Sequence, residues 1–161
     1  MRIFFYLGLL WLSGCATTAP QTEALLRAPP SIAETAEIKT VPFIEQKIGQ
    51  CGPATLTMAM QWAGRPITVD ELALKVMTPG KNGSLQEDMV SASRREGMMA
   101  VQITGMEALL REVAGGHPVI VFENLGLSWY KQWHYAIVIG YDLKKEELIL
   151  HSGPNPFERI N

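Results

Sequence analysis

The fold is decided by the stretch Gln46–Pro53, with the sequence QKIGQCGP, and by the apolar run Ala54–Trp62 that follows it. A glycine-containing turn places Cys51 directly before a predicted helix that is apolar over most of its surface. The N-terminus of a helix carries unpaired backbone N–H groups and about half a unit of positive charge, and both favour a thiolate. We therefore expect a central, buried helix with Cys51 at its start as a candidate nucleophile.

Length and composition predict one compact domain. The chain has 161 residues, of which 47% are hydrophobic, so it is long enough to bury a substantial core. A net charge of -2 without blocks of like charge argues against nucleic acid as a partner. The sequence has no metal-ligand spacing and no Walker motif, so we expect no metal, no cofactor and no ATP binding.

Residues 1–14 are typical of a secretory signal peptide. A basic start, Met1–Arg2, precedes the apolar run Ile3–Leu12, which is too short to be a convincing transmembrane helix. The segment Leu12–Cys15 resembles the lipobox of bacterial lipoproteins, which implies a lipid on the Cys15 thiol and cleavage before Cys15. An ordinary signal peptide with a chance cysteine is the alternative.

The lipobox resemblance also implies a location. Ala16, rather than Asp, follows the lipidated cysteine, which suggests the periplasmic face of the outer membrane. Residues 15–40 are rich in Ala, Thr and Pro, so we expect a lipidated N-terminus and flexible tether, locally helical around Thr22–Arg27. The folded domain is expected to span residues 41–161.

If Cys15 carries lipid, Cys51 has no disulfide partner in the chain. An unpaired cysteine in an exported protein is exposed to oxidation, which invites a functional explanation. The alternative is that Cys51 is a small buried hydrophobic residue.

The remaining pattern predicts helices first and an antiparallel sheet after them, which is an α+β order. Capping boxes at Thr68–Glu71 and Ser84–Glu87 mark the starts of two of the helices. The expected helices are 52–63, 69–77, a segment ending near residue 96, and 106–113, and the expected strands are 98–103, 119–122, 135–141 and 148–151.

A nucleophilic cysteine needs a base, and the chain offers three histidines. His134 stands at the start of the predicted strand 135–141. A cysteine on a helix followed far downstream by a histidine on a strand is the chain order of papain-like cysteine hydrolases, so His134 is the favoured base. His117 and His151 are the alternatives.

Three segments together resemble the C39 and C39-like peptidases of the papain-like superfamily. They are Gln46 with Cys51–Pro53, then Gly116–Val121, and Trp133–Tyr141, within a resemblance that spans about Val41–Ser152. The resemblance implies a papain-like α+β fold in which N-terminal helices pack on an antiparallel sheet.

The resemblance also implies residue roles. Cys51 matches the nucleophile, His134 the general base, and Gln46 the side-chain donor of the oxyanion hole, where it joins the Cys51 backbone N–H. In transporter-fused members the spacing between the glutamine and the cysteine is one residue longer, so Gln50 is an alternative donor.

The residue that orients the histidine is open between two positions. A hairpin centred between Lys144 and Lys145 would place Asn155 opposite His134, and Asn155-Pro156 is similar to the Asp-Pro of the family. An Asn carbonyl can accept the imidazole N–H. Alignment of the strand ends places Ser152 there instead. The family continues with a further core strand after this hairpin, so the domain is expected to be shortened at its C-terminus unless it closes without that strand.

These observations predict a membrane-anchored cysteine peptidase that hydrolyses a peptide or protein substrate through a Cys51–His134 acyl-enzyme mechanism. Two alternatives stay open. One is a non-catalytic peptide-binding or assembly module on the same fold. The other is a different cysteine-dependent reaction, such as that of an amidase or acyl transferase.

Overall fold

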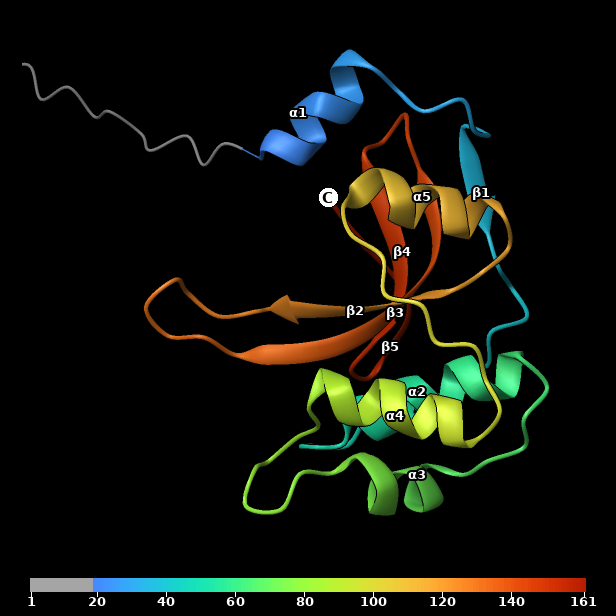
Figure 1. Ribbon diagram of the computed structural model, residues 1–161. Helices are drawn as coiled ribbons and strands as arrows, with labels where there is room; N and C mark the ends of the chain where they lie inside the picture. Colours follow the sequence, from blue (N-terminus) through green and yellow to red (C-terminus); the bar gives the residue numbers. More distant parts are fainter. Residues whose placement is uncertain (1–18) are drawn as a thin grey trace, which may run out of the picture.

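A computed structural model describes residues 19–161 (Figure 1), so the predicted signal peptide and Cys15 lie outside the described residues. The helices precede the main strands, which confirms the α+β order. The elements are α1 (Pro20–Arg27), β1 (Thr35–Glu37), α2 (Cys51–Trp62), α3 (Val69–Val76), α4 (Gln86–Arg95), α5 (Met106–Ala114), β2 (Val119–Asn124), β3 (Trp133–Asp142), β4 (Glu147–Ser152) and β5 (Asn155–Ile160). No helix among these residues is both long enough and apolar enough to span a membrane.

The sheet is antiparallel and is built around β3. One side of β3 pairs with β4, and β5 pairs with the far side of β4. The first part of β3 pairs with β2 and its last part with β1. Figure 1 shows β2 and the start of β3 extending away from the body of the domain as a hairpin. His134 lies in this hairpin, opposite Glu123 of β2.

Both faces of β3 are covered, which explains its unbroken run of buried residues from Tyr135 to Tyr141. Side chains alternate between the two faces of a strand. Ile137 and Ile139 pack with Met58 of α2, whereas Ala136 and Val138 pack with α5. Figure 1 accordingly shows α2, α3 and α4 on one side of β3 and α5 on the other.

The helix α2 is the most deeply buried helix, as its apolar sequence predicts, and most of its residues are buried. Position 52 requires glycine because the backbone there passes close to Ser84. A Cβ at this position would lie 2.6 Å from the Ser84 hydroxyl oxygen. The chain after Cys51 therefore fits against the loop before α4.

The helix expected around Thr22–Arg27 is present as α1, whereas the flexible tether predicted for residues 15–40 is wrong for the segment that joins the sheet. The residues of α1 and β1 belong to the folded domain, and Ala36 of β1 pairs with Tyr141 of β3. The Tyr141 hydroxyl donates a hydrogen bond to the Ala33 carbonyl at 2.8 Å. A short strand with a hydrogen-bonded neighbour is ordered despite its Ala- and Thr-rich surroundings.

Two local predictions are also wrong. Residues 98–104 form no strand, because no neighbouring strand pairs with them. Ser84 does not cap α4, which begins after Leu85 without a side-chain cap. Ser84 instead forms a bridge with Met77. The other capping box is confirmed, since the Thr68 side chain accepts from the Glu71 backbone N–H and the Glu71 side chain returns the bond.

The last residues form β5, a further strand after the hairpin of β3 and β4. The predicted pairing holds from Asp142 with Glu147 to Gly140 with Ile149, and a bulge then shifts the register by one residue. The chain reverses after Ser152, so Asn155 pairs with Ser152 from within β5. The prediction that the β3–β4 hairpin places Asn155 opposite His134 is therefore wrong.

His151 is a structural residue. It is fully buried between the rings of Phe43 and Phe157. Its Nδ1 accepts a hydrogen bond from the Phe157 backbone N–H at 3.2 Å, and its Nε2 lies 3.3 Å from the Val41 carbonyl oxygen. Both nitrogens are thus used by the backbone, and the imidazole must be neutral to accept the first bond.

Acid should destabilise the protein through His151. Burial lowers the pKa of His151 from its ordinary 6.5, so the unfolded chain binds the proton more readily than the folded one. The contribution of neutral His151 to the free energy of unfolding should be fully present at about pH 7.5 and should decrease as the pH drops below about 6.5. Urea unfolding at about pH 7.5 and about pH 5 measures this loss, and His151→Gln should reduce it. His117→Gln, on the surface, is the matched control, and an equal loss in His151→Gln and the unmodified chain would contradict the assignment.

Candidate active site

Cys51 is the first residue of α2 and its thiol is free and half-buried. No acidic residue lies in the first turn of this helix. The backbone N–H groups of Cys51 and Gly52 precede the first intrahelical bond, which runs from the Ala54 N–H to the Gln50 carbonyl at 3.0 Å. The thiol therefore stands beside backbone donors that can stabilise negative charge.

Tyr135 of β3 packs in the same cluster as Cys51. Its hydroxyl donates a hydrogen bond to the Ser84 carbonyl at 3.2 Å. Burial, with smaller contributions from the negative charges of Cys51, Glu87 and Asp88, raises the pKa of Tyr135 to about 12. Tyr135 is therefore a neutral wall of the site at physiological pH, and it brings β3 next to the nucleophile.

His134 precedes Tyr135 in β3, and its Nε2 lies 3.1 Å from the Ser152 hydroxyl oxygen. It lines a cavity of about 270 Å³ together with Glu123, Asn155 and Glu158. Burial lowers the pKa of His134, and the Glu158 carboxylate opposes this shift. The imidazole is thus favoured in its neutral form, which can accept a proton.

Cys51 packs in the cluster of Tyr135, whereas His134 contacts Ser152, and the two proposed partners are not hydrogen-bonded to each other among the described residues. Side chains of successive strand residues leave on opposite faces. Tyr135 turns toward α2, and His134 therefore leaves β3 on the face that Ser152 shares. The Nδ1 of His134 has no hydrogen-bond partner within residues 19–161.

Gln46 joins three parts of the site. Its Nε2 donates to the Thr55 hydroxyl at 2.7 Å and to the Tyr135 carbonyl at 3.1 Å. Its Oε1 accepts from the Gly153 backbone N–H at 3.0 Å. Thr55 lies one helical turn after Cys51, on the same face of α2. The amide is therefore close to the nucleophile, but both of its hydrogens are already engaged.

The remaining candidates separate clearly. Gln50 is the N-cap residue of α2 and makes no side-chain capping bond. Ser152 contacts the imidazole of His134, whereas Asn155 lines the same cavity without a hydrogen bond to that ring. His117 lies at the surface, paired with Glu112 at 3.0 Å.

Sequence reasoning missed Thr55 and Glu158. The spacing of four residues between Cys51 and Thr55 on a predicted helix is a usable signal for Thr55. Glu158 carried no such signal, because its place depends on β5. Within residues 19–161, no three His, Cys, Asp or Glu side chains converge to hold a metal ion.

Comparisons with known proteins agree with this architecture. The model of the Peptidase_C39 like family matches residues 38–158. A crystal structure from Bacillus anthracis, described as a candidate C39-like peptidase, superposes with a TM-score of 0.63 at 20% identity. The match covers 80% of this chain and 88% of that one, and it shows a common fold. No curated protein matches the sequence. Because the family model covers most of its length, the chain belongs to the Peptidase_C39 like family.

Proposed function

We propose that the protein is a cysteine peptidase in which Cys51 is the nucleophile and His134 is the general base. The main supporting observation is that Cys51 stands at the start of the buried α2 and packs with Tyr135 of β3. Tyr135 directly follows His134 in that strand. Family membership supports peptide-bond hydrolysis as the reaction.

The reaction would begin when His134 takes the thiol proton and Cys51 Sγ attacks the carbonyl carbon of a peptide bond. The carbonyl oxygen becomes an oxyanion, which the Cys51 backbone N–H would stabilise. His134 then gives its proton to the leaving amine, and an acyl-enzyme thioester remains. A water molecule, deprotonated by His134, attacks the thioester, releases a carboxylic acid product and restores the thiol.

Two adjustments are required of the structure. His134 must bring its Nδ1 from the Ser152 face of β3 to the Cys51 sulfur, and the Ser152 hydroxyl can follow Nε2 because it rotates freely. Catalytic hydrogen bonds are often longer without substrate than in the reacting complex. The Gln46 amide must exchange one of its two bonds, to Thr55 or to Tyr135, for the oxyanion.

The rival function is a peptide-binding module without turnover. It is favoured by the same two observations, namely the lack of a Cys51–His134 hydrogen bond among residues 19–161 and the engaged Gln46 amide. Chemical reactivity of Cys51 separates the two functions.

Iodoacetamide labelling tests the proposed pair. A thiolate activated by His134 should be alkylated at about pH 6.5 roughly 10-fold faster than the Cys51 of a His134→Ala variant. Mass mapping of the labelled peptide assigns the modification to Cys51. His117→Ala is the matched control and should leave the rate unchanged. Equal rates in all three proteins would favour the binding module.

Ser152 and Asn155 can be compared as orienting residues. Because Ser152 contacts His134 and Asn155 does not, Ser152→Ala should lower the hydrolysis of dye-labelled casein by about 10-fold to 100-fold. Asn155→Ala should change it by less than about 3-fold. The reverse order would assign orientation of the imidazole to Asn155.

We also propose that Cys15 carries a lipid that anchors the domain to the outer membrane, facing the periplasm. Acyl chains stabilise membrane binding by about 0.8 kcal/mol per buried CH₂ group, so several chains hold firmly. The wild-type chain should enter the detergent phase in a Triton X-114 separation, and Cys15→Ala should not become acylated with labelled palmitate. Cys51→Ala should be acylated normally. Acylation of the Cys15→Ala chain would refute this assignment.

A further inference from the structure

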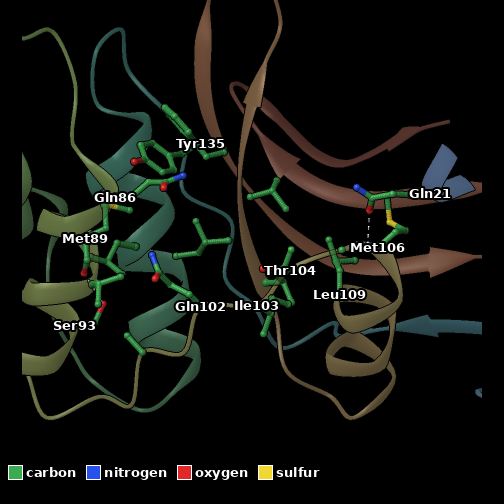
Figure 2. A pocket seen from close by; sticks show the side chains of 18 residues that line it. Gln21, Gln86, Met89, Ser93, Gln102, Ile103, Thr104, Met106, Leu109 and Tyr135 are labelled. Carbon is green, nitrogen blue, oxygen red and sulfur yellow. Dashed lines mark hydrogen bonds between the residues drawn. The ribbon is translucent and has the colours of Figure 1, made fainter. Parts of the chain in front are cut away.

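A second cavity, of about 640 Å³, lies between α4, α5 and β2 (Figure 2). The 18 residues that line it include no charged side chain. Its polar groups are neutral, and three of them are the amides of Gln21, Gln86 and Gln102. One end reaches Tyr135, which packs in the same cluster as Cys51. Cys51 itself does not line the cavity, which shares Tyr135 with the packing around Cys51 and extends to α5.

The cavity adjoins the edge of β2. Four consecutive residues, Val119–Phe122, line it. Neighbouring side chains of a strand point to opposite faces of the sheet. A cavity that all four residues line must therefore lie along the edge of β2 rather than on one face. Within residues 19–161, β2 pairs with β3 alone. Alternate backbone N–H and C=O groups of β2 therefore point away from β3 without a strand partner.

Another part of the lining is a segment whose backbone pairs with no strand, although its Ala100 carbonyl accepts a hydrogen bond from the Arg94 guanidinium at 3.3 Å. Residues 98–104 have no regular secondary structure, and Ala100, Gln102 and Ile103 line the cavity. Among the described residues, the backbone of 99–103 makes no hydrogen bond to another backbone group. Figure 2 shows Gln102, Ile103 and Thr104 on the segment that runs from the α4 side of the cavity to the α5 side.

We propose that this cavity binds an extended peptide segment with uncharged side chains, which adds to the sheet as a strand along the open edge of β2. The proposal rests on the proposed peptidase function and names its substrate class. Main-chain hydrogen bonds provide affinity in this mode of recognition, and side-chain pockets provide selectivity. Asp, Glu, Lys or Arg at the buried positions would lose hydration without meeting an opposite charge.

Aromatic contacts extend the site beyond the cavity. Phe122 of β2 lies 4.5 Å from the Tyr135 ring and 4.9 Å from the Trp133 ring, between centroids. Trp133 is 51% exposed. Its ring offers an apolar platform for a substrate side chain that leaves the cavity.

At the α5 end of the cavity, the Gln21 side-chain oxygen accepts a hydrogen bond from the Met106 backbone N–H at 2.9 Å. This bond connects α1 to the start of α5.

Peptide binding to a full-length Cys51→Ala chain tests the proposal without requiring turnover. The probe is a dye-labelled, end-capped heptapeptide of Val, Leu, Gln and Ser, measured by fluorescence polarisation. Methylation of each backbone nitrogen in turn removes one N–H. Since every second N–H of a strand faces its neighbour, alternate positions should weaken binding by about 10-fold and the others much less.

Charge variants test the neutral lining. A Lys in the centre of the peptide should weaken binding, and Gln102→Glu should restore it, whereas Gln132→Glu in the hairpin loop outside the cavity should not. A period-two methylation pattern without hydrolysis by the unmodified chain would uphold the site and refute the peptidase. Absence of saturable binding, a uniform methylation effect, or displacement of the peptide by a fatty acid would overturn the site.

Discussion

The side-chain amide of Gln46 is the contact on which the site depends. It binds Thr55 of α2, the carbonyl of Tyr135 in β3 and the N–H of Gly153 after β4. These three partners are separated widely in sequence. Thr55 and Tyr135 belong to the elements that carry Cys51 and His134, and Gly153 directly follows Ser152. An amide suits this position because it can donate twice and accept at the same time. A carboxylate in its place would lose both donated bonds.

The order of the elements and the burial of α2 could be predicted from the sequence, because apolar periodicity and turn residues are local signals. The positions of Cys51 on a helix and His134 on a strand follow from the same signals. Register could not be predicted in this way. A bulge between Val138 and Gly140 shifts by one residue all β3–β4 pairs beyond it. The sequence of this stretch gives no signal for the bulge, because a bulge depends on packing across the sheet.

The contact between His134 and Ser152 follows from that shifted register. Of the two orienting candidates that the sequence offered, Ser152 is the one that contacts the imidazole ring. The structure also removes His151 from consideration as a base, because burial and two backbone contacts occupy its nitrogens. Sequence alone offers no means to tell a histidine with a satisfied environment from a reactive one.

The short strand β1 determines where a truncated version of this domain can begin. Gly140 lacks a side chain where the β1 backbone passes, since a Cβ there would lie 2.6 Å from the Ala36 carbonyl oxygen. An expression fragment that starts at residue 41 would remove β1 and leave bare backbone beside Gly140–Asp142. Such an unpaired strand edge can pair with the strands of other chains and promote aggregation. The smallest well-behaved fragment thus begins before Thr35, upstream of the segment that the family model matches.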